Sequence, residues 1–305
     1  VTLYADGAVR LLVPDLEYSR ASEESDADGV HRFSTFDYGE KVVDHGPAKA
    51  GPLATAAFLD EYGADSVSVP ASFPNGTADV LRDRGVAVVT DYDDAVGRIR
   101  AVKTDEEIER ITTTQRANEA AMAAAAEMLE RATVAGGVLR LDGAVLTSER
   151  VRRTIEATLR SEGCEMDECI VASGPESAQG HAVGAGPVEA GEPIIVDVVP
   201  RDRESRYVAD MTRTFVKGEP DDEIREWYDV TRDAYEAALA TIEPGVTGEE
   251  VNHAVCDVFE REGYPTLRTD ESTEDGFTRS TGPGVGLDVH ERPKLSWGGE
   301  ELRPG

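Results

Sequence analysis

The spacing of apolar and polar residues over the first hundred positions predicts strands and helices in alternation. Two apolar runs flank Asp6 and Gly7, a pair that favours the tight turn of a β-hairpin. Gly85 follows a helical pattern, at the position where glycine commonly ends a helix. The expected strands cover residues 2–4, 9–13, 66–69 and 86–89, and the expected helices cover residues 52–62 and 78–84. An α/β domain is therefore expected over residues 1–98.

A second region begins with a long predicted helix. Thr104 followed by Glu107 is typical of a capping box, and acidic residues in a first turn favour the helix dipole. Further helices are expected over residues 147–161, 222–242 and 248–262, and strands over residues 170–172, 194–199 and 207–216. The pattern changes between residues 97 and 103, so we expect a second domain over residues 104–305.

The charge balance restricts the class of partner. The 305 residues include 61 acidic and 31 basic side chains, which gives a net charge of -30, and the basic residues are mostly Arg. Such a field repels nucleic acids and anionic membranes, so neither is expected as a partner. The acids are spread along the chain and Lys is scarce, which we interpret as adaptation to concentrated salt rather than as ordinary acidity.

Composition and cysteine usage indicate a soluble protein of the cytoplasm. No apolar run approaches the roughly 20 residues of a membrane helix, and the first residues do not resemble a secretory signal. The chain has three cysteines, whose number is odd and whose spacing fits no zinc motif. Cys164, Cys169 and Cys256 are therefore expected to be buried thiols in a reducing compartment.

Two aspartates stand out as candidate chemistry. Asp197 lies inside the apolar run Ile194-Ile195-Val196-Asp197-Val198-Val199, and Asp210 lies on the next expected strand. A buried carboxylate without a partner costs several kcal/mol, and two adjacent carboxylates repel unless a cation or a shared proton lies between them. A hairpin could place both on one face. The pattern favours a metal site, with two unrelated acids at strand ends as the other interpretation.

The surroundings of these aspartates resemble the pita-bread metallopeptidases, a group that includes prolidase, Xaa-Pro aminopeptidase and methionine aminopeptidase. The segments that carry the resemblance are residues 103–109, 173–181, 197, 209–214 and 282–293. Residues 1–98 resemble the N-terminal domain of the creatinase, prolidase and Xaa-Pro aminopeptidase branch, which methionine aminopeptidase lacks. The resemblance thus implies an α/β (α+β) fold: a creatinase/prolidase-like domain, followed by a pseudo-two-fold curved antiparallel sheet with outer helices.

The resemblance also implies a reaction and a set of roles. The expected function is hydrolysis of the bond before proline in short peptides, through a water activated by two divalent ions, most often manganese or cobalt. Asp197 and Asp210 would be metal ligands. His290 would stabilise the tetrahedral intermediate or shuttle a proton, and His181 would line the substrate pocket. Members of the family are commonly dimers, so a homodimer is an expected assembly, although no interface can be identified in the sequence.

Several positions depart from the family pattern. The ligand histidine is expected where the chain has Pro283, and a second family histidine is expected where it has Arg279. The two glutamate ligands are expected beyond residue 305, together with further strands. Two of five ligands are therefore present, so we expect weak metal binding and no significant peptidase activity from these 305 residues. A fragment of a longer product and a decayed relative are both compatible with these departures.

Three functions are compatible with the sequence. The first is a metal-dependent Xaa-Pro peptidase. The second is a metal-free creatinase-like amidinohydrolase, which Asp197 and Asp210 disfavour and Pro283 weakly favours. The third is a non-catalytic protein on a pita-bread frame.

Overall fold

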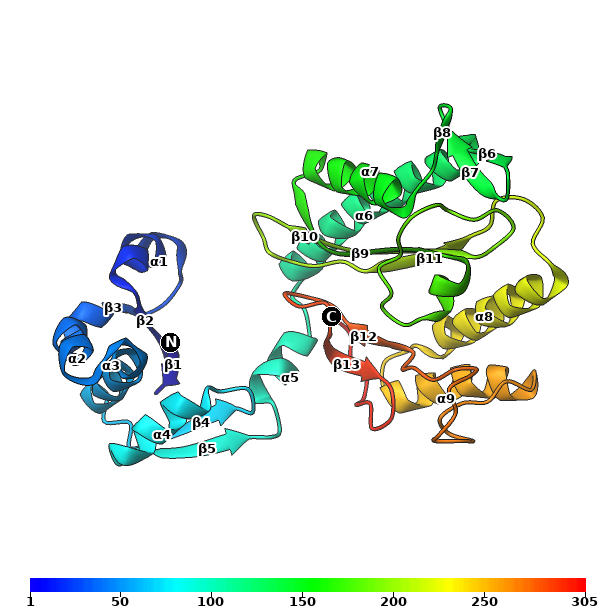
Figure 1. Cartoon of the computed structure of the whole chain (residues 1–305). Helices are drawn as coiled ribbons and strands as arrows, with labels where there is room; N and C mark the ends of the chain where they lie inside the picture. The colour runs from blue at the N-terminus through cyan, green and yellow to red at the C-terminus, as the bar shows by residue number, and fades with distance from the viewer. The chain divides into compact units, whose positions relative to one another are not determined.

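The computed structural model describes all residues from 1 to 305 and divides the chain into two compact units, Val1–Ala95 and Val96–Gly305 (Figure 1). The first unit contains β1 (Thr2–Ala5), β2 (Ala8–Val13), η1 (Asp15–Glu17), α1 (Tyr18–Glu24), β3 (Gly29–Arg32), η2 (Phe33–Phe36), α2 (Tyr38–His45), α3 (Pro47–Glu61), β4 (Ser66–Pro70), α4 (Asn75–Asp83) and β5 (Ala87–Asp91). The first unit has one hydrophobic core and the second unit has two.

The hairpin predicted at the start of the chain is confirmed. Strands β1 and β2 pair antiparallel, and Asp6 and Gly7 between them have φ values of 52° and 76°, as the turn requires. β2 then pairs parallel with β3, and β4 pairs parallel with β5. Phe58 of α3 is fully buried in the core of this unit. The elements α1, β3 and α2 had no counterpart among the predicted elements.

The second unit begins with α5 (Ala95–Ala101), which crosses the division by one residue. It continues with α6 (Asp105–Arg131), β6 (Thr133–Ala135), β7 (Val138–Leu141), β8 (Ala144–Val145), α7 (Ser148–Ser161), β9 (Cys164–Ser173), η3 (Gly174–Ala178), β10 (Ile194–Asp202), β11 (Met211–Phe215), α8 (Asp222–Thr241), α9 (Gly248–Arg261), β12 (Gly282–Gly284) and β13 (Glu291–Leu295). The predicted helices of this region are confirmed within a few residues. The capping box of Thr104 and Glu107 at the start of α6 is also confirmed.

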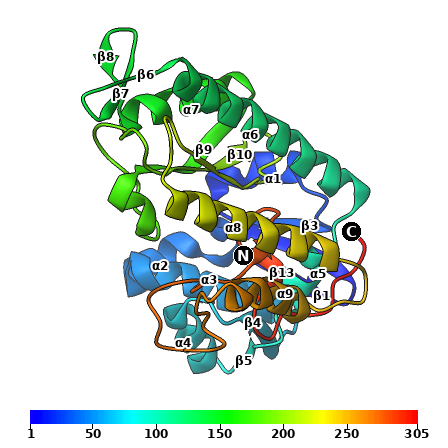
Figure 2. The ribbon, with the colours of Figure 1, turned by 90° about the vertical axis from the view of Figure 1, so that its right-hand side faces the viewer.

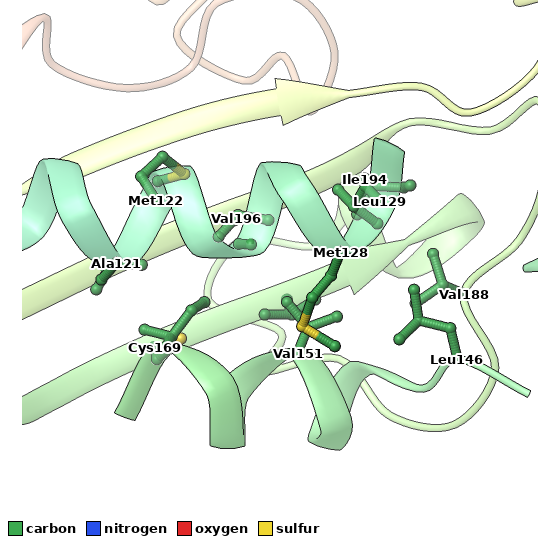
Figure 3. Close-up of a cluster of buried hydrophobic side chains, with 14 of the residues drawn as sticks. Ala121, Met122, Met128, Leu129, Leu146, Val151, Cys169, Val188, Ile194 and Val196 are labelled. Atoms are coloured by element: carbon green, nitrogen blue, oxygen red, sulfur yellow. The ribbon is translucent and has the colours of Figure 1, made fainter. Parts of the chain in front are cut away.

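An antiparallel sheet in the order β11-β10-β9 forms the centre of the second unit, and α6 and α7 pack on one of its faces (Figure 1). Side chains alternate along β10: Ile194, Val196 and Val198 are fully buried. Figure 3 shows Ile194 and Val196 beside Met122 and Leu129 of α6. The same alternation turns Asp197 away from this core.

A second layer is built from α8 and α9, which lie side by side (Figures 1 and 2). Val230 and Ala234 of α8 are buried against Val251 and Val255 of α9. The antiparallel pair β12 and β13 packs next to α9 through β13. This layer places the glycine-rich segment that begins at residue 282 within the same unit as Asp197.

All three cysteines are free and buried, as predicted. Burial raises the pKa of the Cys164 thiol to about 11 and that of the Cys169 thiol to about 12. Both thiols belong to the core beneath α6 and α7. No helix is long and apolar enough to cross a membrane.

Candidate functional site

Asp197 lies on the central strand of the sheet, on the face that α6 and α7 leave open. It pairs with Thr212 of β11 on one side and with Ile170 of β9 on the other. The Thr212 hydroxyl donates a hydrogen bond of 2.9 Å to Asp197 Oδ1. The cross-strand partner thereby fixes the orientation of one carboxylate.

Asp210 comes immediately before β11, not within a strand over residues 207–216 as the sequence suggested. The preceding residues stay beside β10 through an isolated bridge between Val208 and Arg201. They make further bonds as well: Thr114 of α6 donates to the Tyr207 carbonyl, and the Val208 amide donates to the Gly286 carbonyl at 2.7 Å. Asp210 is exposed as a residue, yet its carboxyl is partly desolvated. Desolvation, the charge of Asp197 and a hydrogen bond shared with Asp197 raise the pKa of Asp210 to about 6. The two carboxyl groups therefore meet.

His290 belongs to the segment that follows β12, and hydrogen bonds hold this segment near Asp210. Besides the Val208–Gly286 bond, the Arg201 guanidinium donates to the Leu287 carbonyl at 2.6 Å. His290 lowers the pKa of Asp210 by its charge, against the larger effects of burial and Asp197. The structure thus brings together three of the four candidate residues: Asp197, Asp210 and His290.

A buried charge cluster supports the residue after His290. Glu291 is 9% exposed and pairs with Lys103 at 3.2 Å and with Arg100. Its carboxylate also accepts a hydrogen bond from the Asp288 amide. Although desolvation acts in the opposite direction, the hydrogen bonds from the Asp288 amide, Arg100 and Lys103 lower the pKa of Glu291. This network anchors the chain on the C-terminal side of His290.

His181 lies in the loop after η3 (Gly174–Ala178). It is exposed and has a left-handed φ of 60°. No hydrogen bond or ion pair joins it to Asp197, Asp210 or His290. The Arg152 guanidinium of α7 donates hydrogen bonds to the carbonyls of Val183 and Gly184, and these bonds stabilise the loop.

Pro283 and Arg279 occupy the positions where the resemblance implied histidines. Pro283 lies in β12 opposite Lys294, next to a register shift in the β12–β13 pair. Arg279 is exposed, and its guanidinium lies against the backbone of Gly180 beside His181. A side chain at 180 would come within 2.9 Å of the Arg279 Nη2 atom, so the approach depends on the glycine.

The donors assembled here do not amount to a site for two ions. Asp197 and Asp210 supply hard oxygen atoms of the kind that manganese accepts. Nowhere in residues 1–305 do three or more His, Cys, Asp or Glu side chains form a group that could hold a metal ion. Proline at 283 has no donor atom to complete such a group.

Two features of this region were not predicted from the sequence. One is the Thr212 hydroxyl, which the hairpin register could have indicated, because Thr212 lies opposite Asp197 on β11. The other is a cavity of about 180 Å³ lined in part by Arg279, Phe277 and Trp297. It joins segments that are separated in the sequence, so no local pattern indicates it.

Comparison with known proteins gives consistent similarities. The model for Metallopeptidase family M24 matches residues 109–305. Xaa-Pro dipeptidase from Pyrococcus horikoshii is 27% identical over 291 residues, which cover 94% of this chain and 70% of that protein. The probable dipeptidase PepE from Mycobacterium tuberculosis is 30% identical over 310 residues, covering 100% of this chain and 73% of that protein. Among solved structures, prolidase from Pyrococcus furiosus matches with a TM-score of 0.75 and 26% identity, over 98% of this chain and 77% of that one.

Proposed function

Because the chain belongs to metallopeptidase family M24, a family of hydrolases with the pita-bread fold, we propose that its substrates are short peptides cleaved before proline. The observation that carries this proposal is the meeting of Asp197 and Asp210 on the open face of the sheet, with His290 beside them. The similarity to proteins named Xaa-Pro dipeptidase and prolidase supports the same substrate class.

Within this proposal the four candidate residues have separate tasks. Asp197 and Asp210 would donate oxygen atoms to divalent ions, for which the family resemblance implies manganese or cobalt; carboxylate oxygens suit manganese. His290, next to Asp210, would stabilise the tetrahedral intermediate or move a proton. His181 would contact the substrate from the loop after η3.

The residues present do not fit the two ions that the family implies. Two carboxylates converge, while the position expected to supply an imidazole is Pro283. Mutation of a residue that only orients a metal ligand commonly costs about 10- to 100-fold in metal affinity, and here the ligand itself is missing. We therefore propose that these 305 residues bind divalent ions weakly and have no significant peptidase activity.

The test is a pair of measurements on the purified 305-residue chain. Hydrolysis of an Xaa-Pro dipeptide is followed with added manganese, and bound metal is counted after dialysis. The proposal expects no significant turnover and fewer than two retained ions per chain. Turnover near that of an intact Xaa-Pro dipeptidase would refute the inactivity and restore the dinuclear mechanism.

One observation favours a second candidate, a non-catalytic protein on the pita-bread frame. Pro283 lies inside the glycine-rich segment, so its effect is independent of any residues outside the chain. A metal-free creatinase-like amidinohydrolase is a further alternative, although two adjacent carboxylates have no evident use there. Assays with a small guanidino substrate distinguish the amidinohydrolase from the non-catalytic protein, since only the amidinohydrolase releases product without metal.

We also propose that the chain consists of two domains. Residues 1–98 would be the creatinase/prolidase-like domain, and residues 104–305 would be the pita-bread domain. The separate cores of the two units and the family match from residue 109 onward support this division.

A further inference from the structure

A cavity of about 180 Å³ lies between α9 and the residues that flank β12 and β13. Its walls include Asn252 of α9, Phe277 and Arg279 before β12, and Ser296 and Trp297 after β13. The volume is below the roughly 300–1,000 Å³ that is usual for pockets holding drug-sized ligands. The cavity therefore has room for one group of about the size of an amino acid.

The cations that line the cavity differ in their partners. Arg268 is engaged by Asp257 and by Glu260, which lies 2.6 Å away. Arg279 has no hydrogen bond and no ion pair, although the chain carries a net charge of -30. Its guanidinium rests against the backbone of Gly180, which leaves the donors on its other edge free. Arg279 is thus a cation available to a ligand.

The rest of the wall is suited to an apolar group. Phe277 is held in place by stacking on Phe259, with ring centroids 5.0 Å apart and planes 5° apart. Trp297 is 52% exposed, so the face of its indole remains available for contact. Leu267 adds a further apolar side chain to the same wall.

From this arrangement we propose that the cavity binds a small carboxylate that carries an apolar ring or chain. The Arg279 guanidinium pairs with the carboxylate through two parallel N–H···O bonds, and the apolar part packs on Phe277 and Trp297. The inference deepens the proposed function and rests on it in one respect: the natural carboxylate would be the free C-terminus of a short peptide that ends in proline. Arg279 is thereby the residue that determines specificity for a ligand with a free carboxylate.

Salt affects this binding in two opposite ways. The acidic surface repels an approaching anion, and ions screen that repulsion beyond the Debye length of about 10 Å at 0.1 M. Arg279 is exposed, so ions also screen its attraction for the carboxylate, and chloride competes for the guanidinium. Binding is therefore measured at one moderate ionic strength, which is kept the same for every variant.

The experiment uses Trp297 as the reporter. The chain has two tryptophans, so the Trp227→Phe variant leaves Trp297 as the single indole. This variant is titrated with N-acetylproline and with its neutral amide, in the presence of EDTA, by fluorescence and by calorimetry. Since EDTA removes divalent ions, the measurement does not depend on hydrolysis, and a failed peptidase assay leaves the result standing.

Three variants separate the role of Arg279 from the loss of one charge. We expect N-acetylproline to bind at least tenfold more tightly than the amide, and Arg279→Gln to remove that preference. Arg279→Lys should keep part of it, because an ammonium pairs with a carboxylate without the two-pronged geometry. Arg153→Gln is the matched control, since Arg153 is an exposed, unpaired arginine on α7, and it should bind as the parent does. Equal affinity for the two probes, unchanged binding by Arg279→Gln, or no saturable binding by either method overturns the proposal.

Discussion

Thr212 and Asp197 face each other across β11 and β10, and the Thr212 hydroxyl donates a 2.9 Å hydrogen bond to Asp197 Oδ1. We expect Thr212→Val to lower the free energy of unfolding by about 1 kcal/mol, since the bond has a charged acceptor but lies at an exposed position. Urea unfolding of both single variants and the double variant with Asp197→Asn should give a coupling energy of similar size.

Thr214→Val is the control, because Thr214 lies on the same strand and donates no side-chain hydrogen bond to Asp197. A coupling energy near zero between Thr212 and Asp197 would show that the bond does not orient the carboxylate.

The buried charge cluster around Glu291, the residue after His290, predicts a larger loss of stability than the Thr212 hydrogen bond. Glu291→Gln leaves Lys103, whose side chain is 8% exposed, beside a neutral amide. Breaking a buried pair commonly costs about 3–5 kcal/mol, so we expect a loss of about 3 kcal/mol in chemical denaturation. Asp288→Asn removes the other acid that pairs with Arg100, but its side chain is 66% exposed. That control should cost less than about 1 kcal/mol, and equal losses in the two variants would contradict a buried cluster.

Glu149 predicts a dependence of stability on pH. Its carboxylate accepts a 3.0 Å hydrogen bond from the Gly186 amide, which together with Thr147 lowers the pKa of Glu149 to about 2. Because the folded-state pKa lies below the unfolded value of about 4.3, the contribution is present above that value and is lost as pH falls toward 2. The side chain is 43% exposed, so we expect Glu149→Gln to cost only about 1 kcal/mol at neutral pH.

Unfolding curves from about pH 7 to pH 3 should show the Glu149→Gln difference shrinking as the acid becomes protonated in the unfolded state. Glu156→Gln on the same helix is the control, since Glu156 pairs only with the exposed Arg160. If the stability difference between the parent and Glu149→Gln stays constant over this range, Glu149 does not contribute to the pH dependence of stability.

Local patterns predicted the helices of the second unit well, because capping residues and the helical period mark where these helices begin and end. They predicted the strands less well: β6, β7 and β8 had no predicted counterpart, and β9 covers residues 164–173 where a strand was expected only over residues 170–172. Thr104 and Glu107 cap α6 as expected, and the alternation in β10 turns Asp197 away from the core. The strand predicted over residues 207–216 was too long for a tertiary reason. Tyr207 and Val208 still contact β10, through the Asp202 amide and an isolated bridge to Arg201. They also bond to α6 and to Gly286, and the regular strand begins only at Met211.

The site itself depends on contacts that no spacing specifies. The segment that carries His290 lies near Asp210 because Val208 and Arg201 bond to Gly286 and Leu287, which precede His290. The approach of Arg279 to Gly180 depends on the missing side chain at 180. Both contacts join segments far apart in the chain, and the sequence carries no periodicity that relates them.

The acidic composition predicts stabilisation by salt. With a net charge of -30, repulsion among surface carboxylates opposes the compact state, and ions screen it. We expect the midpoint of thermal unfolding to rise by several degrees between about 0.1 M and about 2 M potassium chloride. Near pH 4, where many carboxylates are protonated, the rise should be smaller. A midpoint that is unaffected by salt at neutral pH would contradict adaptation to concentrated salt.

Pro283→His tests whether one residue limits metal binding. Pro283 lies in β12, and an imidazole at this position would restore the donor that the family pattern places there. We expect manganese affinity, measured by calorimetry, to rise at least about tenfold over the parent. Pro283→Ala is the matched control, since it removes the ring of proline without adding a donor. If both variants bind manganese alike, the histidine position does not face the carboxyl pair, and the weak site has another cause. If Pro283→His alone gains affinity for manganese while hydrolysis stays absent, Asp197 and Asp210 are positioned to act as metal ligands. The absence of hydrolysis would then show that the ligand set of these 305 residues is insufficient for catalysis.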